Sequence, residues 1–367
     1  MSGSISFLIN GLAGGGAETV CTVLANAFAS KGYKVDVVVL NLDYDKNSSK
    51  LDERVKLVNL SSPNARKSIL PLNKYLMERQ PEVILSFSYE LTAIVLLIRF
   101  INSFEFKVVF RNINSISRVM ELYSNLWQRL VVKPLVIYSL RKVDMVINQC
   151  EGMEADLFDY YSKYDVPSVV INNPVKPGLA ELSGDVVSSR EDVLPDEFFV
   201  IVGRLDYQKA VHKAIEAFSL IKERLPEVYL LVLGQGVLEG KLKDLALNLG
   251  VSDRVRFMGF DPHPEVVMKR AIATLLTSEF EGFPNVLVES ITLGTPVIAF
   301  NCVSGPSEIV IDGVNGYLVE QGNVYAFSDK MIELVLTPID RSEVKKSASR
   351  YSIGNIVDQY ERAIFQA

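Results

Sequence analysis

The apolar positions in the first half of the chain form short runs that alternate with stretches of helical spacing. The runs have strand length and lie at Ile5–Ile9, Val35–Leu40, Val55–Leu57, Val83–Phe87, Lys107–Phe110, Met145–Asn148 and Ser168–Ile171. Stretches such as Glu18–Lys31 and Leu72–Arg79 lie between them and have the periodicity of helices. Strands that alternate with helices predict a parallel sheet with helices on both faces.

The second half repeats this alternation after an interruption. Residues 173–196 contain prolines, glycines and serines without an apolar period, and they predict a linker. Further strands are then expected at Phe198–Val202, Val228–Leu233, Val255–Phe257 and Ala273–Leu276, and helices at Leu238–Leu249 and Pro264–Arg270. We therefore predict an α/β protein with two similar domains, residues 1–172 and 197–350. Residues 351–367 predict an amphipathic helix that packs back on one of the halves, with the N-terminal domain as the expected partner.

One stretch of the second half, Ser278–Val310, carries the most distinctive polar pattern. It predicts a strand end, a glycine turn, a helix from about Asn285, a second glycine turn and another strand. Glu281 precedes this helix, and Glu289 lies one turn inside it. Both carboxylates could face one crevice beside the exposed N–H groups of the helix, which suits a hydroxyl-rich, phosphate-bearing ligand. The alternatives are a capping acid and a solvated helix face, although the apolar neighbours of Glu289 argue against the second.

Two other glycine-containing loops follow predicted strands. Residues 11–18 can cradle a phosphate at the start of a helix, or form a tight turn without a ligand. Their spacing does not fit the dinucleotide-binding pattern, and no acid clearly ends the second strand. Residues 203–209 carry Arg204 and Lys209, two cations suited to phosphate oxygens at the carboxyl edge of a parallel sheet. Two solvated surface cations are the alternative.

Composition narrows the class of protein. The chain has 367 residues, a net charge of −6 and no basic cluster, so it is not expected to bind nucleic acid. Two histidines make a histidine-based zinc site or a Ser-His-Asp triad improbable. Three distant cysteines fit buried, reduced thiols. The longest apolar run, Leu91–Ile98, is too short to span a membrane, and no signal segment opens the chain, so we expect a cytoplasmic protein.

The order of these motifs resembles one family. The chain looks like a retaining glycosyltransferase of family 4, of the bacterial surface-glycan type, a class with the GT-B fold of two Rossmann-like domains facing a central cleft. The matching motifs are Gly14–Glu18, Gly203–Leu205, Gln208–Lys209, Glu281–Glu289, Gly294–Val297, Gly305–Ile309 and Asn315–Gly316. They span essentially the whole chain.

The resemblance implies the roles of several residues. Arg204 and Lys209 would hold the donor diphosphate, Glu281 the hydroxyls of the donor sugar and Glu289 the ribose. Arg204, Lys209, Glu281 and Arg111 form the implied catalytic set. The remaining donor-binding residues would be Gly15, Gly16, Gly203, Phe260, Gly282, Phe283, Pro284 and Asn285.

Two positions depart from the family pattern. Many relatives carry a histidine after the strand that corresponds to Lys107–Phe110, whereas this chain has Arg111 and Asn112. Either residue is expected to take over the positioning of the reacting sugar. Ala210 replaces the glycine that usually follows the lysine.

The implied reaction moves a hexose or N-acetylhexosamine from a UDP-sugar to a glycan acceptor, expected to be linked to a lipid diphosphate. No cofactor or metal is expected, because cations and helix dipoles can neutralise the leaving diphosphate. The Asp43–Asp45 triplet mimics a metal-binding motif but is expected to be part of a polar loop.

Several alternatives stay open. The segment 118–142 mixes apolar and basic residues; a buried helix is the favoured interpretation, and a face that contacts anionic membrane is the other. A nucleotide-sugar epimerase of the same fold, an NAD-dependent oxidoreductase and a catalytically silent binding partner are the competing functions.

Overall fold

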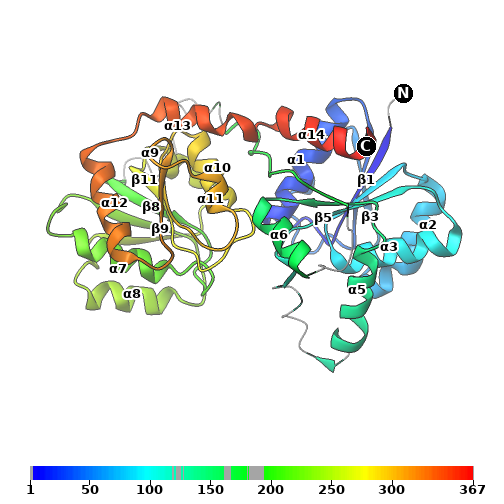
Figure 1. Ribbon diagram of the computed structural model, residues 1–367, viewed down its shortest axis with the longest axis horizontal. Coiled ribbons are helices and arrows are strands. Elements are labelled where there is room, and N and C mark those ends of the chain that lie inside the picture. The colour runs from blue at the N-terminus through cyan, green and yellow to red at the C-terminus, as the bar shows by residue number, and fades with distance from the viewer. Residues whose placement is uncertain are drawn as a thin grey trace. The chain divides into compact units, whose positions relative to one another are not determined.

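The computed structural model describes residues 3–117, 120, 125–126, 128–160, 167–179, 181 and 194–366. The chain forms two compact units (Figure 1). Unit 1 comprises Met1–Lys176 and Ser352–Ala367, and unit 2 comprises Pro177–Tyr351. About half of the predicted linker, 173–196, lies outside the described residues, and the units divide near its beginning.

Unit 1 is built on a parallel sheet of seven strands in the order β3-β2-β1-β4-β5-β6-β7. The strands are β1 (Ser4–Ile9), β2 (Lys34–Val39), β3 (Val55–Asn59), β4 (Val83–Ser86), β5 (Lys107–Arg111), β6 (Met145–Asn148) and β7 (Ser168–Val170). Most central strand residues are buried, as expected where helices cover both faces of a parallel sheet.

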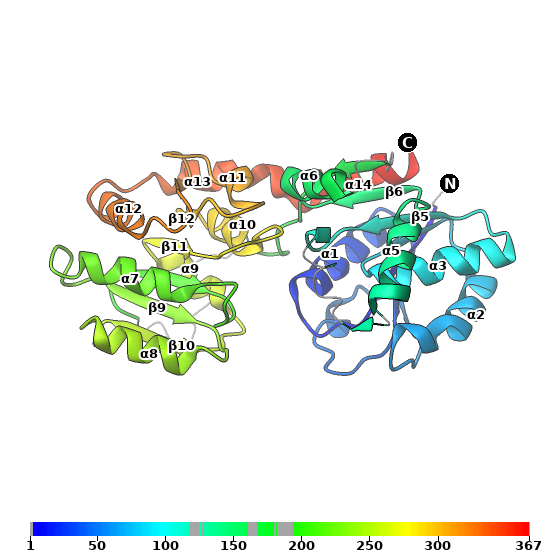
Figure 2. The same ribbon diagram turned by 60° about the horizontal axis from the view of Figure 1, so that its bottom comes forward.

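Helices cover this sheet on both faces (Figure 2). The core on one face includes α2 (Ile69–Arg79), α3 (Tyr89–Asn102), α5 (Lys133–Leu140) and α6 (Glu151–Tyr160). The core on the other includes α1 (Gly16–Ser30) and α14 (Ile353–Phe365). Short turns of helix lie at η1 (Ser48–Lys50), η2 (Ala65–Ser68) and η3 (Gln128–Val132).

Unit 2 has a parallel sheet of six strands in the order β10-β9-β8-β11-β12-β13. The strands are β8 (Phe198–Val202), β9 (Tyr229–Leu233), β10 (Val255–Gly259), β11 (Ala273–Leu276), β12 (Val297–Phe300) and β13 (Gly316–Val319). The helices are α7 (Val211–Ile221), α8 (Glu239–Asn248), α9 (Pro264–Arg270), α10 (Asn285–Thr292), α11 (Pro306–Ile309), α12 (Val324–Leu336) and α13 (Arg341–Ser347), followed by η5 (Ala348–Tyr351). The core beneath α7, α8 and α12 is the larger of the two that the sheet separates.

The prediction of two parallel α/β domains is confirmed. The three cysteines are buried thiols, as expected, and none of them forms a disulfide.

The segment 118–142 bears out the favoured sequence interpretation only in part. Its described part buries one side of α5, where Val136 and Leu140 are at most 1% exposed, whereas Leu130 and Tyr138 expose 67% and 58% of their surface. Arg118, Leu122, Tyr123 and Trp127 lie outside the described residues. The periodicity of an apolar stripe is the same whether the stripe faces a core or solvent, so the pattern could not distinguish these cases.

The C-terminal helix α14 packs against α1 within unit 1. Its apolar stripe includes Ile356, Tyr360 and Ile364, which are each at most 1% exposed. The Tyr360 hydroxyl accepts a hydrogen bond from Nε of Arg111 at 2.8 Å. Burial raises the pKa of Tyr360, so the phenol stays neutral and can serve as this acceptor at physiological pH. An ion pair between Lys31 and Asp358, at 2.6 Å, adds a weaker surface contact.

The Tyr360→Phe variant tests the contribution of this hydrogen bond. It leaves a buried, charged donor of Arg111 without its acceptor while preserving the shape of the ring, so unfolding should cost about 1–3 kcal/mol less. Urea denaturation measures the change, with the exposed Tyr325→Phe as control. Equal stability of the two variants would contradict this account of α14 docking.

Candidate active site

Most of the predicted site residues of unit 2 lie where the strand order of its sheet reverses. From β8 the chain adds β9 and β10 on one side and then β11, β12 and β13 on the other. In open parallel sheets, ligands bind beyond the carboxyl ends of the strands at such a reversal. The loop after β8, residues 203–210, and the loop after β11, residues 277–284, therefore meet at the position expected for a ligand.

An ion pair joins these two loops. Nζ of Lys209 lies 2.6 Å from Oε1 of Glu281, and the two side chains are 18% and 7% exposed. The Ser278 hydroxyl donates a second hydrogen bond to the same carboxylate oxygen, also at 2.6 Å. The sequence motifs predict the lysine and the glutamate but not Ser278, because an isolated serine before a loop carries no recognisable signal.

Hydrogen bonds to the backbone hold the loops in place beside this pair. Glu279 donates its N–H to the carbonyl of Gln208 at 2.8 Å, and the Gln208 side chain donates to the carbonyl of Phe280 at 3.1 Å. Ser304 donates its hydroxyl to the carbonyl of Glu281 at 2.8 Å. The main chain around Glu281 is thus fixed from two sides before any ligand arrives.

Arg204 differs from Lys209 in its surroundings. Its side chain is 72% exposed and contacts Gln208 at 3.1 Å and Asp206 at 3.4 Å. Contacts of this exposed kind contribute little to stability, so the guanidinium can turn toward a ligand at small cost. Ala210, which stands where the family usually has glycine, adopts the left-handed conformation with φ +43° that glycine favours.

Helix α10 begins at Asn285, as the sequence predicts, and Glu289 lies one turn inside it. Glu289 is half-buried, so it does not lie on a fully solvated helix face. Phe283 is buried, and its ring packs edge-on against Tyr351 with 5.9 Å between centroids. The side chain of Phe283 therefore stabilises the fold, which leaves only its backbone for the predicted contact with the donor.

Two glycines allow the loop after β9 to approach the loop after β8. A Cβ on Gly234 would lie 1.8 Å from the carbonyl oxygen of Gly203, and one on Gly236 would lie 2.3 Å from that of Leu205. Phe260, predicted to contact the base, directly follows β10 and is 61% exposed. An exposed ring at this edge of the sheet is available for stacking.

The glycine turn of unit 1 occupies the corresponding reversal, between β1 and β4. Gly14 has φ +96°, and Gly15 is the N-cap of α1. The Glu18 carboxylate lies 2.5 Å from the position of a Cβ on Gly15, so a side chain there would have to displace the flexible end of Glu18. The turn thus exposes backbone N–H groups at a helix start, as the sequence predicts, and the contact of Gly15 and Gly16 with diphosphate stays a prediction.

The structure opposes a direct catalytic role for Arg111. The side chain is 1% exposed, donates hydrogen bonds to Tyr360 and to Asn173, and lies over the ring of Phe87. At 1% exposure, little of the guanidinium is accessible to a ligand. Arg111 instead connects β5 to α14 and to the segment at Asn173. The strand pattern could not reveal this, because α14 lies some 250 residues away in sequence.

Asn112, the other residue expected to replace the family's histidine, is also fully buried. Its Oδ1 accepts from the Tyr89 hydroxyl at 2.7 Å, and its Nδ2 donates to Oδ1 of Asn148 at 3.0 Å. Gln149 donates to the Asn112 carbonyl at 2.9 Å. These residues form a hydrogen-bonded polar network at the carboxyl edge of β5 and β6, which no motif in the sequence predicts.

The Asp43–Asp45 triplet forms a polar turn, as expected. Oδ1 of Asp45 accepts the N–H groups of Asn47 and Ser48 at 3.1 and 2.9 Å. These hydrogen bonds hold the Asp45 carboxylate within the turn.

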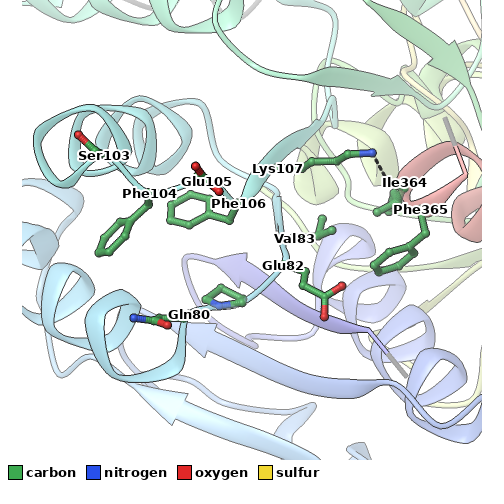
Figure 3. Close-up of a pocket in the computed structure, with 11 residues that line it drawn as sticks. Gln80, Glu82, Val83, Ser103, Phe104, Glu105, Phe106, Lys107, Ile364 and Phe365 are labelled. Atoms are coloured by element: carbon green, nitrogen blue, oxygen red, sulfur yellow. Dashed lines mark hydrogen bonds between the residues drawn. The ribbon is translucent and has the colours of Figure 1, made fainter. Parts of the chain in front are cut away.

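A separate hollow of about 580 Å³ lies at the opposite edge of the unit 1 sheet (Figure 3). It is lined by the segments before β4 and β5, including Glu82 and Phe104, and by the end of α14. Nζ of Lys107 donates to the carbonyl of Ile364 at 3.1 Å across its side (Figure 3). None of the predicted site residues lines it, and ligands of parallel α/β sheets bind at the other edge.

Comparison with known proteins matches both halves of the chain to glycosyltransferase families. Residues 14–179 match the family described as Glycosyltransferase Family 4, and residues 189–351 match the family described as Glycosyl transferases group 1.

Similar proteins cover nearly the whole chain. An uncharacterized glycosyltransferase of Haemophilus influenzae is 25% identical over 97% of this chain and 98% of its own length. The N-acetylgalactosamine-N,N'-diacetylbacillosaminyl-diphospho-undecaprenol 4-alpha-N-acetylgalactosaminyltransferase of Campylobacter jejuni is 27% identical over 94% of this chain and 92% of its own. The solved structure of Anabaena HepE in complex with UDP superposes with a TM-score of 0.79 at 19% identity, covering all of both chains.

The close approach of the β8 and β9 loops predicts the effect of Gly234→Ala. A Cβ there meets backbone and sits at φ +147°, so the variant should lose about 2–4 kcal/mol of unfolding free energy. Gly240→Ala is the matched control, because its Cβ meets nothing within 4 Å in α8, and it should be neutral or gain up to about 1 kcal/mol. Thermal unfolding measures the stability of both variants. A Gly234→Ala variant as stable as the control would refute the close approach of the β8 and β9 loops.

Proposed function

The chain belongs to the glycosyltransferases of family 4 with the GT-B fold, and from that premise we propose that it transfers a hexose or N-acetylhexosamine from a UDP-sugar to a glycan acceptor with retention of the anomeric configuration. The acceptor is a lipid-diphosphate-linked glycan, and the product is a surface polysaccharide or glycoconjugate. The name of the Campylobacter relative, which acts on a diphospho-undecaprenol substrate, supports this acceptor class. A protein of the same fold solved with UDP supports the nucleotide.

The ion pair of Lys209 and Glu281 at the strand reversal carries the proposal. A donor with a diphosphate and a sugar needs a cation and a hydroxyl-binding acid side by side, and these two side chains lie 2.6 Å apart on loops held by backbone hydrogen bonds. An oxidoreductase would leave both residues without a function.

In the proposed complex, Lys209 and Arg204 bind the diphosphate, and Glu281 accepts hydrogen bonds from the donor sugar. Glu289 binds the ribose, Phe260 stacks on the base, and the backbone N–H groups around Asn285 add further donors. The half-buried lysine supplies the charge next to Glu281, and the exposed arginine supplies a second charge that can turn toward the ligand.

The chemistry breaks the bond between the anomeric carbon and the diphosphate and forms one from that carbon to the acceptor hydroxyl. The acceptor attacks from the face that the diphosphate leaves, and its proton passes to a diphosphate oxygen. Lys209 and Arg204 stabilise the charge that develops on the departing UDP, which is the main contribution that fixed cations make to such a reaction. The reaction needs no metal and no further cofactor.

Donor binding on this account replaces one partner of Lys209 by another. In the ligand-free protein Glu281 neutralises the lysine, so the arriving diphosphate must compete with a carboxylate at 2.6 Å. The displaced Glu281 is then available for the hydroxyls of the sugar. The full donor gains affinity from two contacts, that of its diphosphate with Lys209 and that of its sugar hydroxyls with Glu281. UDP alone gains affinity only from the first.

An exposed apolar and basic surface on unit 1 supports contact with membrane lipid. It comprises Leu130 on η3, Leu135 and Tyr138 on α5, and Phe100 and Ile101 on the neighbouring α3, which are 48–84% exposed. Basic residues of the same segment are Arg129, Lys133, Arg141 and Lys142. Among the described helices, none is both long and apolar enough to cross a bilayer. We propose that this surface, which we call the α3–α5 face, adheres to anionic lipid at the inner side of the cytoplasmic membrane.

A UDP-release assay tests the function. We expect UDP release from one member of a panel of UDP-hexoses and UDP-N-acetylhexosamines, only with glycan acceptor and undiminished by chelator. Lys209→Ala should lower kcat/KM by about 10²–10³-fold, because it removes a charge that stabilises the leaving group. Glu281→Gln should lower transfer comparably yet bind UDP about tenfold more tightly, because the competing carboxylate is gone.

The pair Lys243 and Glu239 on α8, also at 2.6 Å but exposed, provides the matched controls Lys243→Ala and Glu239→Gln. Both should behave as the wild type. Normal turnover in Lys209→Ala, or interconversion of UDP-sugars without acceptor, would reject the proposed transferase site.

Vesicle sedimentation tests the α3–α5 face. The protein should bind vesicles that contain phosphatidylglycerol more strongly than vesicles of phosphatidylcholine, and Leu130→Glu with Leu135→Glu should weaken binding at least about tenfold, because each leucine loses its apolar insertion. Leu247→Glu on α8, which changes an equally exposed leucine of unit 2, is the control. Equal binding by the double variant and the control would overturn the proposal.

A further inference from the structure

Ser278 stands directly beside the acid of the proposed site. It lies in the loop after β11, is 1% exposed, and donates its hydroxyl to Oε1 of Glu281 at 2.6 Å. We propose that Ser278 is a positioning residue, which orients the Glu281 carboxylate so that Oε2 receives the hydroxyls of the donor sugar. This inference rests on the proposed function and adds a residue to it.

The two carboxylate oxygens of Glu281 have different surroundings. Lys209 and Ser278 both approach Oε1, each at 2.6 Å. Within the part of the chain that the structure describes, Oε2 has no hydrogen-bond partner, although the Glu281 side chain is only 7% exposed. One oxygen is thus held by the protein, and the other is left as an acceptor at the edge of the site.

The hydroxyl of Ser278 acts on the side chain of Glu281 and is not needed to hold its backbone. Ser304 already fixes the Glu281 carbonyl at 2.8 Å, and the Glu281 N–H donates to the carbonyl of Val303 at 3.4 Å. Removal of the Ser278 hydroxyl should therefore leave the loop in place and release only the carboxylate.

The serine becomes more important once the donor binds. In the proposed exchange, Lys209 turns from Glu281 to the diphosphate, and the carboxylate loses one of its two anchors. Ser278 is then the remaining donor to Oε1. A short side chain with one rotatable bond holds this position at little entropic cost, whereas the lysine has four. The serine thus keeps the acid aimed at the sugar in the state that reacts.

The test compares the affinity for UDP with that for UDP-glucose and UDP-N-acetylglucosamine by calorimetry. Ser278→Ala should leave the Kd of UDP unchanged and weaken binding of the preferred UDP-sugar about tenfold, because a mobile carboxylate loses roughly one charged hydrogen bond to the sugar. Ser290→Ala is the matched control, since Ser290 is equally buried and donates to the carbonyl of Thr295, away from Glu281. It should leave both affinities unchanged.

A double-mutant cycle separates positioning from packing. In a Glu281→Ala background the Ser278→Ala change should have no further effect on either affinity, because the group that it orients is missing. An undiminished effect there, or a Ser278→Ala variant that resembles Ser290→Ala, overturns the inference while the proposed function stands. Unchanged UDP binding in Lys209→Ala would instead overturn the proposed function, and this inference with it.

Discussion

The ion pair between Lys209 and Glu281 is the interaction on which the proposed site depends. Two charges with this little exposure are costly unless each has a partner, and each serves as partner to the other at 2.6 Å. The ligand-free site therefore holds a cation and a carboxylate next to one another. The donor's diphosphate can replace Glu281 as the partner of Lys209, and its sugar hydroxyls can replace Lys209 as the partner of Glu281. The same two residues therefore stabilise the empty site and make it specific for a nucleotide sugar.

The fold supplies the geometry for this pair. Parallel strands bring their carboxyl ends to one edge, and the reversal between β8 and β11 separates two neighbouring loops there. Gly234 and Gly236 let a third loop approach so closely that side chains would not fit. The same reversal in unit 1 places the glycine turn before α1. In unit 2 the loops after β8 and β11, and in unit 1 the glycine turn after β1, lie where the topology puts ligands.

Local patterns in the sequence predicted most of the fold and much of the site. The period of the apolar residues predicted the alternating elements, and α10 begins at Asn285 as expected. The apolar period could not predict contacts between distant segments. The burial of Arg111 depends on Tyr360 and Asn173, and no local pattern joins these residues. Ser278 was missed for a different reason: it lies only three residues before Glu281, but an isolated serine carries no signal until the side chain of Glu281 is seen to fold back onto it.

The most direct measurement is a crystal structure of the protein with the UDP-sugar that it prefers. The account predicts that Nζ of Lys209 contacts a diphosphate oxygen and has left Glu281, while Ser278 still donates to Oε1 and a sugar hydroxyl donates to Oε2. A donor bound elsewhere, or one bound beside an unbroken pair of Lys209 and Glu281, would contradict it.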